Sequence, residues 1–265
     1  MAFTAKDVQA LRQATGVGML DAKRALEENG GDIGEATQWL RVHGLAGAAK
    51  RADREASQGA VAVVREGNVA AMVDLRCETD FVAKAAEFVS LADELASLVV
   101  TKGEHAGAER QEEIDHLRTT LKENISLGRT VRIEAADGEV LDTYLHQQAG
   151  RGVNGVIVLL RGGGQELAHD VALHIAFARP SYLRREDVPD AEVAAERATV
   201  EEISRNEGKP EAALPKIVEG RMNGWFKERC LLEQNFARDE KQTIAGMLSS
   251  AGAEVVRFAQ IVIGS

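Results

Sequence analysis

The chain switches its hydrophobic period from strand-like to helix-like twice, and this constrains its fold more than any other feature. From Gly59, the apolar runs 60–65 and 69–76 flank Glu66-Gly67-Asn68, which is the pattern of a β-hairpin. A helical pattern then begins at Thr79, with its apolar row at Phe81, Ala85, Phe88, Ala92, Leu95 and Val99. We therefore expect a hairpin followed by a long amphipathic helix.

The second half of the chain repeats this order. A strand, a glycine turn, a helix and a last strand are indicated at 155–161, 162–164, 166–178 and 255–263. The first half is completed by a helix and two further strands, at 109–122, 130–135 and 140–146. This predicts two related α+β units with small antiparallel sheets, at 59–146 and at 147–186 with 229–265. The residue-level similarity between the halves is too weak to prove a repeat.

Three short helices precede the strands and make a domain of residues 1–44. Thr4 can cap the first helix, Gly16 and Gly18 precede a second at 19–28, and Asp32 can cap the third. A bundle of this kind resembles a ubiquitin-associated domain. The following stretch, 45–58, mixes small residues with lysine and arginine, and we interpret it as a linker that is helical in part.

A helical hairpin is predicted within the second unit, at 187–228. Its first helix covers 190–206, Gly208-Lys209-Pro210 breaks the pattern, and Pro215 is an acceptable first residue for the second helix. Two helices joined by a short break indicate an antiparallel hairpin that projects from the body. The predicted fold class is therefore α+β, with an N-terminal three-helix bundle, two related subdomains and an inserted helical hairpin.

Composition and missing motifs exclude several functions. The net charge of −10 argues against binding to duplex nucleic acid and against adhesion to an anionic membrane. Cys77 and Cys230 form no CxxC pair, and no signal peptide or apolar membrane segment is present, so we expect a cytoplasmic protein. The sequence contains neither a P-loop nor an HExxH motif. We predict no catalytic centre, no cofactor and no metal.

Two stretches remain ambiguous when they are considered residue by residue. Thr79 can cap a helix and Asp80 suits the positive end of its dipole, which places Phe81 in the first turn. Phe81 is then either an exposed plug or the start of the core row, and the residues favour neither. Met19 and Leu20 are adjacent, so one can be buried while the other faces outward, and packing of the small bundle is slightly favoured.

Three segments that occur together resemble the elongation factor Ts family, and the resemblance spans nearly the whole chain. They are LRQATGVGMLDAKRAL at 11–26, CETDFVAK at 77–84, and IVEGR with LLEQ within 217–234. The resemblance implies a guanine-nucleotide exchange factor that binds the GDP form of the GTPase elongation factor Tu and promotes exchange for GTP. Such a factor makes no bond and binds no nucleotide itself.

The resemblance also implies roles for particular residues. The segment Thr79, Asp80, Phe81 and Val82 would contact the GTPase near its nucleotide, with Phe81 inserted so that the magnesium site is disturbed. Arg12, Met19 and Leu20 would contact another face of the same domain. His146 would lie toward the remainder of the partner. The hairpin at 187–228 resembles an element that mediates homodimerisation in some members.

The sequence departs from the family pattern at three places. Arg76 stands where the family usually has asparagine, so hydrogen bonding at the strand end is expected to differ. Lys122 stands where glycine is usual, which puts the partner contact of that region in doubt. The chain also stops soon after its last strand, where some members carry a further helix.

Two other readings compete with exchange. A general protein-binding module explains the N-terminal helices but not CETDFVAK. An enzyme that uses the carboxylates of Glu78 and Asp80 is remote, because residues two apart at a helix start point in different directions.

Overall fold

Two three-stranded antiparallel sheets form the body of the protein in a computed structural model that describes residues 3–264. The first sheet has the order β1 (Gln58–Glu66), β2 (Val69–Cys77) and β3 (Ser126–Glu134), and the second has the order β4 (Glu139–Gln148), β5 (Arg151–Arg161) and β8 (Glu254–Val262). In each sheet, a hairpin is followed by a later strand that pairs with the second hairpin strand. This shared topology confirms the predicted α+β fold.

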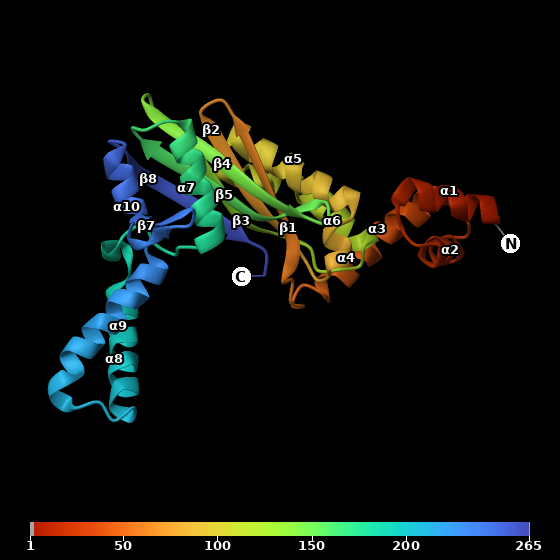
Figure 1. Ribbon diagram of the computed structural model, residues 1–265. Helices are drawn as coiled ribbons and strands as arrows, with labels where there is room; N and C mark the ends of the chain where they lie inside the picture. Colours follow the sequence, from red (N-terminus) through yellow and green to blue (C-terminus); the bar gives the residue numbers. More distant parts are fainter. Residues whose placement is uncertain (1–2, 265) are drawn as a thin grey trace.

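The sheets pack against each other, and helices cover their outer faces (Figure 1). On the first sheet lie α5 (Ala86–Lys102) and α6 (Gln111–Thr120), and on the second lie α7 (Gln165–Ala178) and α10 (Ile244–Ser250). Side chains such as Met72 and Ile157 fill the space between the sheets. The strands approach closely at Gly155, where a Cβ atom would lie 2.6 Å from the sulfur of Met72.

The predicted boundary between the units at residue 146 is wrong. β4 belongs to the second sheet, so the boundary lies in the turn at Asp137-Gly138 between β3 and β4. β4 pairs instead with β5 across the two-residue turn Ala149-Gly150, in which both φ angles are positive, as a type I′ turn requires. A pattern of alternating residues does not specify which neighbour a strand pairs with, and this is why the sequence left the boundary misplaced.

The N-terminal domain consists of α1 (Ala5–Thr15), α2 (Met19–Glu28) and α3 (Ile33–Ala49). Thr4 and Asp32 cap the first and third helices as predicted. α3 continues past the expected linker boundary at 44, because its alanines favour helix and Gly44 lets it pass close to α6. A Cβ atom on Gly44 would lie 2.3 Å from the Cγ2 atom of Thr119.

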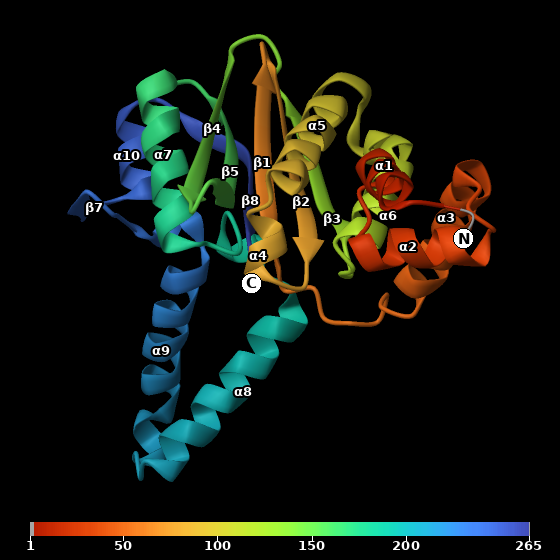
Figure 2. The same cartoon turned by 90° about the vertical axis from the view of Figure 1, so that its right-hand side faces the viewer.

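The hairpin consists of α8 (Asp190–Asn206) and α9 (Leu214–Arg229), which project together from the body (Figures 1 and 2). Val200, Val218 and Met222 pack in its interior.

Short elements complete the fold, namely α4 (Asp80–Ala83), β6 (Asn235–Phe236), β7 (Asp239–Thr243) and 3-10 turns at Glu104–Arg110, Arg185–Asp187, Glu211–Ala213 and Leu231–Glu233. Of the helices between residues 3 and 264, none combines the length and apolar character needed to cross a bilayer.

Candidate functional site

The segment around Phe81 forms a helix of only four residues, α4, instead of the start of a long helix. Thr79 caps it, and its hydroxyl oxygen accepts a hydrogen bond from the Val82 N–H at 3.3 Å. The chain then becomes extended at Ala85 before α5 begins. Phe81 is therefore out of phase with the core row, since its side chain is 82% exposed whereas Phe88 is fully buried. The structure excludes Phe81 from the core and leaves it in solvent.

A carboxylate from a distant loop holds the segment that precedes Phe81. Glu123 accepts hydrogen bonds from the N–H groups of Glu78 and Thr79, both at 3.0 Å, and from the Thr79 hydroxyl at 2.5 Å. Glu78 in turn accepts the N–H of Asn124 at 2.7 Å. These reciprocal bonds, which we call the Glu123 clamp, fix α4 to the loop before β3. The sequence contains no local signal for this contact, because its partners lie 44 to 46 residues apart.

The other residues of the motif are arranged around Phe81. Asp80 forms an ion pair with Lys84 one turn later, and the hydrogen bond from Lys84 lowers the pKa of Asp80 below its ordinary value. The carboxylate is therefore charged at neutral pH. Val82 is half-buried against the core of the first unit, and Ala83 is buried there. The helix is thus anchored on one side and presents Phe81 on the other.

The N-terminal residues predicted to bind the partner are also at the surface. Arg12 is exposed, as are Met19 and Leu20, with Leu20 82% exposed. The idea that one of the adjacent pair is buried is wrong, because the core face of α2 is formed by Ala22, Ala25 and Leu26 farther along the helix. Met19 and Leu20 lie in its first turn and remain available for contact.

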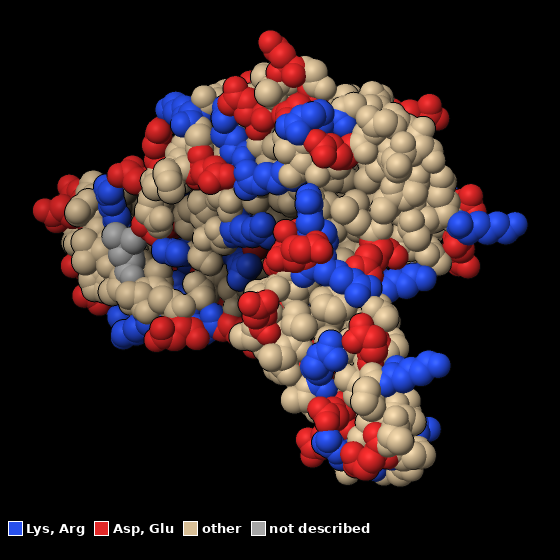
Figure 3. All heavy atoms as spheres, turned by 90° about the vertical axis from the view of Figure 1, so that its left-hand side faces the viewer, with Lys and Arg blue, Asp and Glu red and all other residues tan. Residues whose placement is uncertain are grey.

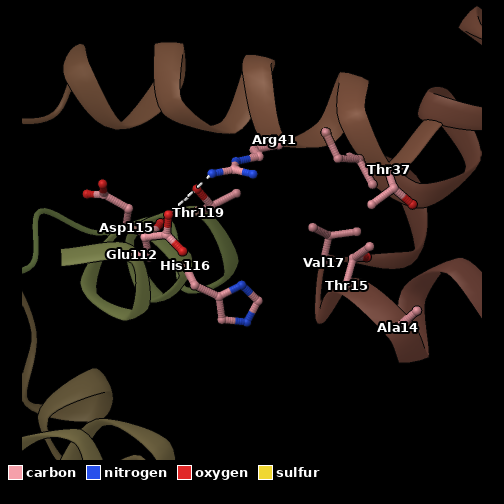
Figure 4. A pocket seen from close by; sticks show the side chains of 10 residues that line it. Ala14, Thr15, Val17, Thr37, Arg41, Glu112, Asp115, His116 and Thr119 are labelled. Atoms are coloured by element: carbon pink, nitrogen blue, oxygen red, sulfur yellow. Dashed lines mark hydrogen bonds and ion pairs between the residues drawn. The ribbon is translucent and has the colours of Figure 1, made fainter. Parts of the chain in front are cut away.

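The N-terminal domain docks on α6 through polar contacts around a cavity of about 310 Å³ (Figure 4). Arg41 of α3 lines this cavity and lies 3.7 Å from the Glu112 carboxylate. Beside a neighbouring cavity, the Arg51 guanidinium donates to the Arg118 carbonyl at 3.0 Å. Figure 4 shows His116 of α6 pointing into the space opposite Val17 and Thr15. These contacts connect Met19 and Leu20 to the unit that carries Phe81.

His146 lies near the end of β4, at the same end of the sheets as α4. It is exposed, and it faces the Tyr144 hydroxyl at 3.5 Å. Arg151, at the start of β5, is buried and donates to the Gly59 carbonyl and to the Gln58 amide oxygen. Because Gln58 pairs with Cys77 just before the motif, Arg151 ties the second unit to the strands beneath α4. Sequence reasoning missed this buried arginine.

Comparison with known proteins decides the family. Residues 78–265 match the family described as "Elongation factor TS". The chain is 45% identical to the elongation factor Ts of Kineococcus radiotolerans, over 100% of this chain and 99% of that protein. It is 44% identical to that of Clavibacter michiganensis subsp. michiganensis over 99% of both, and 45% identical to that of Leifsonia xyli subsp. xyli over 98% of both. The chain belongs to the elongation factor Ts family.

The first departure from the elongation factor Ts pattern, Arg76, has a local partner. Its Nε atom donates to the Asp74 carboxylate at 2.6 Å. Asp74 is buried, and its second carboxylate oxygen has no hydrogen-bond partner among the described residues. A buried carboxylate without a cation is costly. Arg76 therefore compensates the charge of Asp74 at the strand end.

The second departure, Lys122, stands at a position whose backbone favours glycine. Its φ angle is +58°, in the left-handed region that favours glycine. The Lys122 ammonium forms an ion pair with Asp21 of α2 at 2.5 Å, so in this elongation factor Ts homologue the lysine contacts the N-terminal domain. This contact is available because α2 faces the loop before β3.

We expect Lys122→Gly to be more stable than Lys122→Ala by about 1 kcal/mol, because only alanine retains the steric cost of a left-handed backbone. Both variants lose the ion pair with Asp21, so the difference isolates the backbone term. Urea unfolding of the two variants measures it. Equal stabilities would contradict the assignment of strain to this position.

Both cysteines of this elongation factor Ts homologue are buried thiols. Burial, with a smaller contribution from Glu123, raises the pKa of Cys77 from 9.0 to about 12, and burial raises the pKa of Cys230 to about 11. Cys77 also donates to the Thr79 carbonyl at 3.2 Å. Neutral, buried thiols are poor nucleophiles. Within residues 3–264, no group of three or more His, Cys, Asp or Glu is placed to hold a metal.

We expect Cys77 and Cys230 to resist alkylation by iodoacetamide at about pH 8 in the native protein and to react in urea. Because the folded pKa values are raised, burial of the thiols favours folding fully below the ordinary value of 9.0, and this contribution is lost as pH rises through about 11 to 12. Mass spectrometry of the labelled peptides checks the first point. Rapid labelling of Cys77 without denaturant would show that the motif loop opens.

Proposed function

We propose that this chain is a guanine-nucleotide exchange factor that binds elongation factor Tu in its GDP form and promotes replacement of GDP by GTP. Membership of the elongation factor Ts family supports this role in translation. We infer that it acts in the cytoplasm and without an active site or cofactor of its own. The observation that carries the proposal is an almost fully exposed Phe81 on a short helix held by the Glu123 clamp.

Phe81 acts as the inserted group in this proposal. An exposed phenylalanine gains roughly 1.5–3 kcal/mol when it is buried in a partner. The Glu123 clamp fixes the backbone of α4 before binding, so little conformational entropy is lost when Phe81 enters its site. Insertion near the nucleotide would disturb the magnesium site and lower the affinity for GDP. By reciprocity, GDP must lower the affinity of the GTPase for this chain by the same factor.

The remaining contacts are spread over the molecule. Each tenfold acceleration of release needs about 1.4 kcal/mol, so Phe81 alone supplies about one to two powers of ten. We assign the rest of the interface to Thr79, Asp80 and Val82 in the motif, to Arg12, Met19 and Leu20 in the N-terminal domain, and to His146 in the second unit. The assigned residues of the N-terminal domain and of the second unit are exposed, and those of the motif lie beside Phe81 in the chain, which supports this assignment.

The hairpin is assigned a separate role in homodimerisation. It projects from the body (Figure 2), and Ile203 of α8 is partly exposed on its surface. Light scattering of the isolated chain tests this assignment. A mass equal to one chain at high concentration would overturn it without affecting the exchange function.

The exchange function is tested by the release of a fluorescent GDP analogue from elongation factor Tu. We expect an amount of this chain far below that of elongation factor Tu to accelerate release of the analogue from many GTPase molecules in turn. Excess GDP should dissociate the complex between the two proteins. Heat-unfolded chain serves as the control. A release rate that does not depend on the folded chain would overturn the proposed function.

A further inference from the structure

A groove of about 660 Å³ runs between β8 and the segment 179–187, at the base of the hairpin. Four arginines line it together with a single acid, Asp187; they are Arg129, Arg179, Arg184 and Arg257. Apolar side chains, including Leu183 and Val256, complete its walls. Figure 3 shows lysine and arginine side chains across the middle of the body on this side, above the hairpin.

The arginines of this groove are poorly neutralised by the protein itself. Among the ion pairs of residues 3–264, none involves Arg129, Arg179 or Arg257, and Arg184 has only Asp187, at 3.9 Å. The chain as a whole carries a net charge of −10. The groove is therefore a positive site on an acidic protein, and it attracts a negatively charged partner by charge complementarity.

One wall of the groove is the open edge of a sheet. Among the described strands, β8 pairs with β5 alone. The Ile263 N–H donates toward β5, to the Val153 carbonyl, whereas the Gln260 carbonyl accepts from Arg129 on the opposite side. Since backbone groups alternate in direction along a strand, Phe258 presents its N–H and C=O groups to the groove and Gln260 presents its N–H, while the Gln260 carbonyl is bonded to Arg129. Such an edge is a template for a further strand.

We propose that an extended, acidic segment of a partner protein binds in this groove and adds a strand to β8. Its backbone would bond to the N–H and C=O of Phe258 and to the N–H of Gln260, and its carboxylates would pair with the four arginines. Strand addition takes affinity from the backbone and specificity from side-chain pockets. A nucleic acid would match the charge but would use neither the strand edge nor the apolar wall at Leu183 and Val256. The proposal is independent of the residues assigned to nucleotide exchange.

A fluorescein-labelled peptide of alternating glutamate and valine, long enough to span the nine residues of β8, tests the proposal. We expect saturable binding to the full chain by fluorescence anisotropy. The double variant Arg179→Glu with Arg257→Glu should weaken binding by about tenfold or more, because attraction becomes repulsion at two positions. The control Lys216→Glu with Lys241→Glu makes the same change in net charge elsewhere and should retain binding.

Two further measurements separate strand addition from a general charge effect. Hydrogen exchange should slow at the amides of Phe258 and Gln260 when the peptide is bound, and N-methylation of alternate peptide residues should abolish binding. No saturable binding, equal loss in both double variants, undiminished binding of the methylated peptide, or preferential binding of a labelled RNA oligonucleotide would each overturn the proposal. The Arg179→Glu, Arg257→Glu variant should still accelerate GDP release, so the two functions are tested separately.

Discussion

Replacing Phe81 with alanine is expected to slow stimulated GDP release from elongation factor Tu by about tenfold to a hundredfold. The reason is the loss of the roughly 1.5–3 kcal/mol that burial of one phenylalanine in the partner provides. Because the Phe81 side chain is 82% exposed in the free chain, its removal leaves no internal cavity. The release rate of a fluorescent GDP analogue at saturating variant concentration measures the effect.

The control for this experiment is Ile203→Ala, which also truncates an exposed apolar side chain but lies on the hairpin. It should leave release unchanged. Thermal unfolding of Phe81→Ala should match that of the unmodified chain. Full stimulation by Phe81→Ala would contradict the insertion role of Phe81, whereas a lowered unfolding temperature would contradict its placement outside the core.

Replacing Glu123 with alanine is expected to lower the free energy of unfolding by about 2 kcal/mol and to slow stimulated GDP release by about tenfold. The carboxylate accepts three hydrogen bonds from Glu78 and Thr79, and the variant leaves those donors without it. Without the clamp, α4 samples more conformations, and binding must then restrict them at an entropic cost. Urea unfolding and the GDP-release assay measure the two effects.

Glu66→Ala is the matched control for Glu123, since Glu66 is an exposed acid at the β1–β2 turn and takes part in no ion pair described for residues 3–264. It should change neither quantity. A Glu123→Ala variant that is destabilised but fully active would contradict the positioning role of the clamp. The amides of Thr79 and Val82 should exchange hydrogen faster in Glu123→Ala than in the unmodified chain, and Glu66→Ala should show no such change. This result would support the positioning role independently.

Helices and caps were predictable where the signal is local. The second and eighth helices were placed at 19–28 and 190–206, as observed, and Thr4 and Asp32 cap the first and third. A helix is specified by apolar spacing over a few turns and by the residues at its ends. The same local signals indicated two units, because in each half of the chain an apolar strand and a turn are followed by an amphipathic helix, but they did not place the boundary between the units.

The phase of Phe81 was not predictable in this way. No proline or glycine marks the break between α4 and α5. Ala83 and Phe88 are both fully buried, yet five residues apart they would lie on different faces of one continuous helix. In the structure the helix is interrupted between them, and both side chains pack in the core of the first unit. Packing of α4 and α5 against β1 and β2 thus decided whether the Phe81 side chain is exposed or belongs to the core, and the sequence pattern does not reveal this packing.

The sequence by itself determined the order of the longer strands and helices, the N-terminal bundle, the projecting hairpin and the resemblance to elongation factor Ts, because these depend on periodicity and on short motifs. Only the tertiary structure decided that β4 pairs with β5, that Glu123 holds the motif and that Phe81 is exposed. Those features depend on contacts between residues far apart in the chain, where energies of packing and hydrogen bonding, not local propensity, choose the partner.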